Sequence, residues 1–260
     1  MMIFYWEKIL IPYEQAVEEL KVKFKGIRNE YRRLDEYSPI EFVTGRVKAI
    51  SSILDKARRR NVPLERVEEE IEDIAGIRIM CQLVDDIEKV VELIRSRDGK
   101  DLRIVEERDY ITNIKESGYR SYHIIIKYKV HTVFGEKEIL AEIQIRTLAM
   151  NFWATIEHSL NYKFSRNIPE DVKERLKNAA EAAFLLDQEM SEIKDEITDA
   201  QEIFQLKSSL IVDILKKIQN LYFTGKIKEI EGIQERFLVL QEHGSVAELR
   251  RFSKELDEML

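Results

Sequence analysis

The sequence predicts an α/β (α+β) fold in which a mixed β-sheet of about five strands is framed by helices. Two observations indicate this class. The 260 residues include only 9 Gly and 4 Pro, which favours long helices with few turns. Segments with helical periodicity lie at both ends of the chain, and β-rich segments with one helix among them lie in the middle, an order typical of a sheet framed by helices.

The first third of the chain alternates between helix and strand. Apolar residues at three- and four-residue spacing predict a helix over residues 4–33, in which Pro12 marks a first-turn position or a kink. A short strand is expected at 42–48 and a helix at 51–60. Alternating side chains within 74–84 predict a further strand.

The rest of the chain continues the sheet and then becomes helical. Asp85 and Asp86 begin a helix that is expected to run to about residue 97. The remaining expected elements are strands at 102–111, 122–130 and 138–147, helices at 148–164 and from 169 to about 215, and short helices broken at Gly225 and Gly244.

Composition excludes several classes of protein. With 44% apolar and 35% charged residues, the chain is globular rather than disordered. Its longest stretch without Asp, Glu, Lys or Arg is residues 147–156, too short to cross a bilayer, and no basic secretion signal begins the chain. The single cysteine, Cys81, excludes intrachain disulfides and cysteine-rich zinc sites. We therefore expect a cytoplasmic protein.

The formal net charge of −7 is unevenly distributed along the chain. Residues 23–60 carry eleven basic and five acidic side chains, so this segment is +6 and the remainder is −13. Six carboxylates then fall within residues 65–73. Such blocks form either solvated helix faces or a polyphosphate cradle beside a carboxylate-held cation, and charge alone leaves both possibilities open.

The strand at 141–146 is the most informative candidate for a site. Its period of two places Glu142, Gln144 and Arg146 on one face and the apolar residues on the other. A strand with a solvated polar face has the same pattern. The residue types nevertheless offer a metal ligand, a hydrogen-bonding arm and a phosphate clamp in register.

Two further segments carry chemistry-bearing residues. Asp73 lies at the entry to a buried strand, where it is either a turn residue or, if it meets Glu142, half of a two-carboxylate magnesium site. Residues 109–123 join two strands by a long aromatic connection, in which Gly118 permits a bend and Tyr119 offers a ring for base stacking, with Lys115 or Arg120 on phosphate. A plain surface loop is the alternative.

Together these segments resemble one family. Residues 73–81, 115–123 and 142–147 strongly resemble the synthetase domain of the RelA/SpoT superfamily, and residues 148–163 narrow the resemblance to single-domain small alarmone synthetases of the RelQ-like type. The resemblance covers about residues 5–201. It implies a nucleotidyltransferase-like synthetase domain at 1–201 and leaves 202–260 as a helical C-terminal extension, which either lengthens an oligomer interface or, as we favour, packs on the long helix.

The resemblance implies transfer of the pyrophosphoryl group of ATP to the 3′-hydroxyl of GDP or GTP, giving AMP and ppGpp or pppGpp. Asp73 and Glu142 match the family's catalytic carboxylates and ligands for Mg²⁺. In the ATP site, Arg46 and Arg78 match the arginines that sandwich adenine, and Lys48 with either Arg58 or Lys56 matches the residues that face the phosphates. Those matching the GDP/GTP site are Lys115, Tyr119, His123, Gln144 and Asn151.

The RelQ-like type also implies a homotetramer with a central cleft for a pppGpp effector. The residues matching that cleft are Lys25, Arg28, Glu41, Phe42 and Thr44. No segment resembles the family's hydrolase or its ribosome-binding regulatory domains, so alarmone degradation is not expected. Residues 202–260, with nine basic and ten acidic side chains, give no nucleic-acid signal of their own. The alternative functions are nucleotidyl transfer and a non-catalytic regulator that binds guanine nucleotides or RNA.

Overall fold

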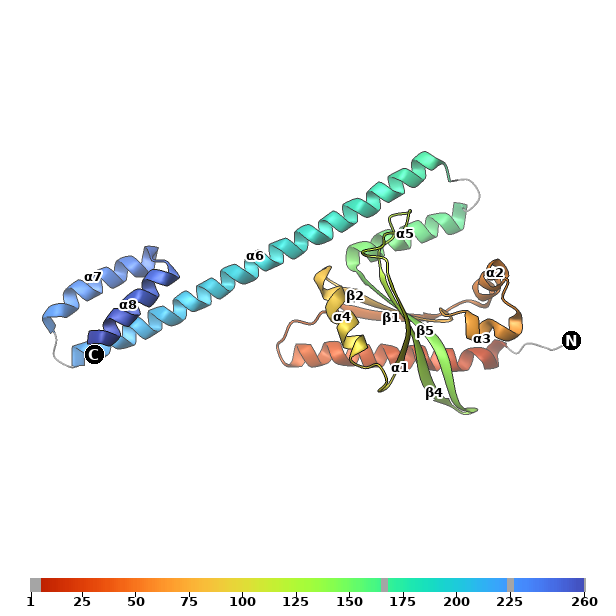
Figure 1. Cartoon of the computed structure of the whole chain (residues 1–260), viewed down its shortest axis with the longest axis horizontal. Coiled ribbons are helices and arrows are strands. Elements are labelled where there is room, and N and C mark those ends of the chain that lie inside the picture. The colour runs from red at the N-terminus through yellow and green to blue at the C-terminus, as the bar shows by residue number, and fades with distance from the viewer. Residues whose placement is uncertain (1–5, 165–167, 224–226, 260) are drawn as a thin grey trace. The chain divides into compact units, whose positions relative to one another are not determined.

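The computed structural model describes residues 6–164, 168–223 and 227–259 and divides into two compact units, Met1–Ser191 and Glu192–Leu260. The first unit contains the β-sheet and the second is helical (Figure 1). The functional boundary at residue 201 remains a prediction from the family resemblance. No helix in the described parts of the chain combines the length and apolar character needed to span a membrane.

The sheet has the five strands expected from the sequence. Their bounds are Phe42–Val47 for β1, Ala75–Cys81 for β2, Arg103–Asp109 for β3, Tyr122–Thr132 for β4 and Gly135–Thr147 for β5. The strand order is β1-β2-β5-β4-β3. Only the pairing of β2 with β5 is parallel, and the other three pairings are antiparallel, so the predicted mixed sheet is confirmed.

The helices also follow the predicted order. They are α1 (Trp6–Arg33), α2 (Ile50–Arg60), the 3₁₀ turn η1 (Leu64–Arg66), α3 (Val67–Glu70), α4 (Asp85–Arg95), α5 (Leu148–Phe164), α6 (Glu170–Phe223), α7 (Ile227–His243) and α8 (Val246–Met259). The short α3 was not predicted because four residues are too few to show helical periodicity. Pro12 lies inside α1 rather than in its first turn, and the expected start at residue 4 falls outside the described residues.

One face of the sheet forms the core with α1. Helix α1 packs across β1, β2, β4 and β5 (Figure 1). Its apolar side chains at helical spacing, among them Ala16, Leu20 and Phe24, are fully buried against the apolar face of the strands. Each large apolar side chain buried in this way contributes about 1.5–3 kcal/mol. Cys81 is buried in the same core, and burial raises the pKa of its thiol, so it is an inert structural residue.

The helical unit has a small apolar core of its own. The last part of α6, α7 and α8 supply its buried residues, which are Ile214, Ile218, Leu221, Phe237, Leu249, Phe252 and Leu256. Helix α8 begins with a capping box, in which the Ser245 hydroxyl accepts from the Glu248 amide and the Glu248 carboxylate accepts from the Ser245 amide. Helix α6 continues past the predicted end near 215 because Ile218 and Leu221 anchor its last turns in this core.

Candidate active site

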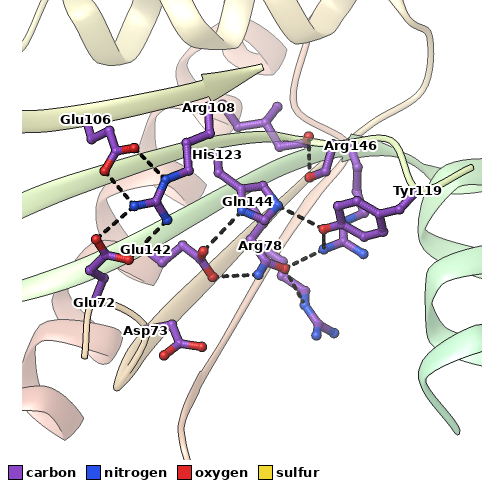
Figure 2. Close-up of polar contacts among 12 residues, drawn as sticks. Glu72, Asp73, Arg78, Glu106, Arg108, Tyr119, His123, Glu142, Gln144 and Arg146 are labelled. Carbon is purple, nitrogen blue, oxygen red and sulfur yellow. Dashed lines mark hydrogen bonds and ion pairs between the residues drawn. The ribbon is translucent and has the colours of Figure 1, made fainter. Parts of the chain in front are cut away.

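Asp73 and Glu142, 69 positions apart in the sequence, face the same cavity (Figure 2). The parallel register of β2 and β5 pairs Gly76 with Glu142, and Asp73 lies two residues before β2 begins. The cavity measures about 240 Å³. Its lining residues are Thr44, Gly45, Arg46, Asp73, Gly76, Arg78, Glu142 and Gln144. The sheet therefore brings the two predicted carboxylates together with two of the arginines predicted to bind ATP.

Asp73 is held by two lysines. Lys48 Nζ lies 2.7 Å from Asp73 Oδ2 and Lys56 Nζ lies 2.8 Å from Oδ1, and all three side chains are less than 20% exposed. Burial raises the pKa of Asp73, but the two ammonium groups outweigh it and hold the pKa below its ordinary value. Asp73 is therefore ionised at neutral pH. Arg58, in contrast, is 79% exposed and lies 3.8 Å from Asp55.

Glu142 is fixed by neighbours on its own face of the sheet. Its Oε1 lies 3.1 Å from His123 Nδ1, and its Oε2 accepts a hydrogen bond of 2.6 Å from Gln144 Nε2. Burial raises the pKa of this carboxyl group, but these hydrogen bonds outweigh the effect and lower it. Because Glu142 is ionised and accepts, the consistent arrangement has His123 donating from Nδ1.

The hydrogen bonds continue from His123 to Tyr119 and Arg146 (Figure 2). His123 Nε2 lies 2.8 Å from the Tyr119 hydroxyl, which accepts at 3.2 Å from Arg146 Nη2. Arg146 also donates to Gln144 Oε1, to which Arg78 Nε donates at 3.3 Å. Arg146 is only 3% exposed. Alternation suggested the Arg146 guanidinium as a phosphate clamp. In the structure it lies inside the hydrogen-bond network that positions Tyr119 and Gln144.

Residues 110–121, here called the tyrosine loop, connect β3 to β4. In this loop the Lys115 ammonium group lies over the rings of Tyr110 and Tyr119. Lys115 Nζ lies 4.0 Å from the ring centroid of Tyr110 and 4.9 Å from that of Tyr119. Burial is the main cause of a lowered pKa at Lys115. The bend predicted at Gly118 is confirmed by its φ of +84°. Asn151, in α5, has a buried Oδ1 without a hydrogen-bond partner among the described residues.

The sequence is similar to those of known proteins. The family described as the region found in RelA / SpoT proteins matches residues 45–167. The GTP pyrophosphokinase YjbM of Bacillus subtilis is 63% identical over 202 residues, which cover 78% of this chain and 94% of that protein. The chain belongs to the RelA/SpoT family. A second B. subtilis GTP pyrophosphokinase, YwaC, is 41% identical over 74% of this chain and 91% of its own length.

Solved structures of the RelA/SpoT family share the fold. Small alarmone synthetase 1 of B. subtilis, bound to its product pppGpp, has a TM-score of 0.70 and 64% identity, covering 74% of this chain and 97% of that one. A GTP pyrophosphokinase family protein of Streptococcus pneumoniae has a TM-score of 0.72 and 56% identity, covering 77% and 98%. The predicted RelA/SpoT resemblance and fold class are thereby confirmed.

The residues that were predicted from the family resemblance to line an effector cleft lie in two places. Arg28 Nη1 donates to the backbone oxygen of Glu41 at 3.2 Å, and Gln82 Nε2 donates to the Glu41 carboxylate at 2.8 Å. Thr44 instead lines the cavity that contains Asp73 and Glu142. The half-buried side chains of Lys25 and Phe42 complete the set. An effector role for these residues remains a prediction.

One ion-pair group at this RelA/SpoT site was not identified from the sequence. Arg108, on β3, makes a two-pronged pair with Glu72 at 3.0 and 2.8 Å and also pairs with Glu106 (Figure 2). The β3–β4 register places Arg108 opposite His123, so the pair ties the segment carrying Asp73 to the strand beside His123. The available signal was the position of Glu72 next to Asp73, but the surrounding carboxylates suggested a solvated face.

Proposed function

We propose that the chain transfers the pyrophosphoryl group of ATP to the ribose 3′-hydroxyl of GDP or GTP, giving AMP and ppGpp or pppGpp. The observation that carries the proposal is the meeting of Asp73 and Glu142 in one cavity next to Tyr119. Similarity to YjbM supports it, as do the structures of B. subtilis small alarmone synthetase 1 bound to its product pppGpp and to AMPCPP.

Two ionised carboxylates fit a magnesium-dependent reaction. Hard carboxylate oxygens suit Mg²⁺, which commonly takes one or two of them and completes its shell with water and substrate phosphates. Among the described residues no three acidic, histidine or cysteine side chains gather into a metal-binding group. Asp73 and Glu142 would hold the ion, which neutralises phosphate charge during transfer.

The donor nucleotide fits the side of the cavity lined by β1 and β2. Arg46 and Arg78 would sandwich the adenine, as the family resemblance implies. Lys48 and Lys56 carry the charge needed by the ATP phosphates, and their ion pairs to Asp73 hold both ammonium groups at the cavity. Because phosphoryl-type transfer depends mainly on positioning and charge stabilisation, these cations supply much of the catalysis.

The acceptor nucleotide fits the side formed by the tyrosine loop, β4 and β5. Tyr119 would stack on guanine, and Lys115 would face the acceptor phosphates. Glu142 would accept a hydrogen bond from the 3′-hydroxyl and align it for in-line attack. Its lowered pKa makes it a weak base, so the proton moves to Glu142 late, when the hydroxyl has become acidic in the transition state.

The proposal also includes the assembly and setting expected from the resemblance. These are a homotetramer, synthesis without hydrolysis, a cytoplasmic location, and a cleft for a pppGpp effector lined by Lys25, Arg28, Glu41, Phe42 and Thr44. Size-exclusion chromatography with light scattering tests the tetramer directly. Titration with pppGpp in the wild type and in an Arg28→Gln variant tests the effector.

Product analysis tests the reaction. The protein is incubated with ATP, Mg²⁺ and GDP or GTP, and the nucleotides are resolved by ion-exchange chromatography. We expect AMP together with a guanosine tetra- or pentaphosphate, loss of both products in Asp73→Asn, and wild-type turnover in Asp55→Asn, an exposed acid on α2. Release of free pyrophosphate would indicate nucleotidyl transfer, and absence of any conversion would indicate a binding regulator.

A further inference from the structure

The tyrosine loop packs against the first part of α6. Gly118 approaches this helix so closely that a Cβ built on it would lie 2.7 Å from the Cβ of Ala180. Tyr119 packs against a small cluster formed by Trp153, Ala154 and Ala180. The indole nitrogen of Trp153 donates to the backbone oxygen of Leu176 at 2.8 Å, which joins α5 to α6 behind the loop.

The strongest contact between the tyrosine loop and α6 is made by Arg120. Its side chain is only 4% exposed, and its Nη2 lies 2.6 Å from Glu181 Oε2. The guanidinium carbon lies 4.3 Å from the ring centroid of Phe184, and Nη1 donates to the Gly118 backbone oxygen at 3.3 Å. A buried guanidinium needs a counter-charge, and Glu181 is the carboxylate that pairs with it here.

Arg120 lies between two residues that belong to the site. Tyr119 on one side is hydrogen-bonded to His123 and Arg146, and the Ser121 hydroxyl on the other donates to the Ile145 backbone oxygen at 3.1 Å. The backbone of one residue thus links the ring predicted to stack on guanine with the ion pair on α6. Displacement of Arg120 displaces Tyr119 as well.

We propose that the Arg120–Glu181 ion pair is a positioning device that holds the tyrosine loop in the conformation that binds the guanine nucleotide. This inference rests on the proposed function, since it assigns the loop to the acceptor. Neither residue touches the reacting atoms in this arrangement, so both act through Tyr119. The pair determines affinity for GDP and GTP and leaves the ATP side, formed by β1, α2 and β2, unaffected.

A merely structural role predicts a different result. If the ion pair only stabilised the fold, removing it would lower the melting temperature and leave the Michaelis constants of folded enzyme unchanged. If it positions the loop, removing it raises KM for the guanine nucleotide selectively. Glu181 is the suitable residue to change because its side chain is 55% exposed, so neutralising it leaves the packing of α6 in place.

The experiment compares Glu181→Gln with Glu189→Gln, an exposed glutamate of the same helix, in the full-length protein. For Glu181→Gln we expect KM for GDP and GTP to rise roughly five- to tenfold, less than the full loss of a charged hydrogen bond because Gln keeps an acceptor, with KM for ATP within about twofold. Glu181→Asp, which keeps the carboxylate, should restore most of the affinity. Glu189→Gln should behave as the wild type.

Hydrogen–deuterium exchange supplies a readout that is independent of turnover. Exchange of the backbone amides of residues 115–121 should accelerate in Glu181→Gln and not in Glu189→Gln. Equal exchange and equal KM values in the two variants would overturn the proposal. If the wild type made no alarmone and bound no GDP by calorimetry, the proposed function would be overturned. Faster loop exchange in Glu181→Gln would in that case still support the positioning of the loop.

Discussion

The two sides of the candidate active site are held by different interactions. The donor side (Arg46, Lys48, Lys56, Asp73 and Arg78) depends on ion pairs, because both oxygens of Asp73 are bound by lysine ammonium groups. The acceptor side (Lys115, Tyr119, His123, Glu142 and Gln144) depends on a continuous hydrogen-bond chain from Arg146 through Tyr119 and His123 to Glu142.

This difference affects how each side would bind its nucleotide. On the donor side both lysine ammonium groups are paired with Asp73, so a polyphosphate bound as proposed would compete with Asp73 for Lys48 and Lys56. On the acceptor side both oxygens of the Glu142 carboxylate are already hydrogen-bonded, to His123 and to Gln144, so the carboxylate has a fixed orientation. Under the proposed function, the donor side would therefore exchange its ion pairs on binding ATP, whereas the acceptor side would be preorganised for its nucleotide.

The largest effect is expected when the preorganised carboxylate loses its charge. Glu142→Gln should lower kcat by roughly 10²–10⁴-fold, the range for a group that handles a proton in the transition state. KM for ATP should change little, because the ATP phosphates face Lys48 and Lys56 on the other side. Steady-state kinetics with each nucleotide varied in turn checks this. A variant with wild-type kcat would remove Glu142 from the chemistry.

A smaller, selective effect is expected on the donor side. Lys56→Met should raise KM for ATP roughly tenfold, because a charged hydrogen bond is worth about 1.5–3 kcal/mol. Arg58→Met is the matched control, since that side chain is exposed and paired with Asp55, and it should stay within about twofold. The same kinetic assay checks both variants. If Arg58→Met had the larger effect, the donor phosphates would lie outside the Asp73 ion pairs.

The smallest effect concerns stability behind the acceptor side. Burial raises the pKa of Asp187, which accepts from the Thr147 hydroxyl, to about 6. Because the native state holds this proton more tightly than the unfolded state, the stability it contributes is present at low pH and is lost as pH rises from about 4 to about 6. Asp187→Asn keeps the hydrogen-bond acceptor and should be more stable than the wild type at pH 8 by about 1–2 kcal/mol, less than the roughly 3 kcal/mol that two pKa units represent, because the amide NH2 must also be buried.

Urea denaturation of both proteins at pH 4.5 and pH 8 measures the Asp187 effect. The gain should largely disappear at pH 4.5, where the wild-type carboxyl is mostly protonated. Glu189→Gln controls for loss of one negative charge on α6. An equal gain at both pH values would mean that the carboxyl does not titrate between them.

Local patterns were sufficient to predict much of this molecule. Strict alternation placed Glu142 and Gln144 on the face opposite Ile143, which is buried in the core. Helical spacing identified the buried face of α1. These predictions succeed because the backbone period alone decides which side chains share a face.

Which charged side chains form ion pairs in the folded chain could not be predicted in the same way. The sequence left Lys56 and Arg58 as alternatives for the donor phosphates, and only the three-dimensional path of the chain brings Lys56 to Asp73 and leaves Arg58 exposed. Arg108 and Glu72 lie 36 positions apart, and no local period links a strand residue to a turn. The interior position of Arg146 was hidden for the same reason, since burial depends on the tyrosine loop that covers it.

The parallel pairing of β2 with β5 also has a kinetic consequence. Every other pairing in the sheet is antiparallel, whereas this one joins strands separated by the whole of α4, β3 and β4. Long-range pairings of this kind are slow to form because loop-closure entropy is lost before the contact is gained. Asp73 and Glu142 can meet only after β5 has docked beside β2, so recovered turnover should report the last step in refolding of the sheet.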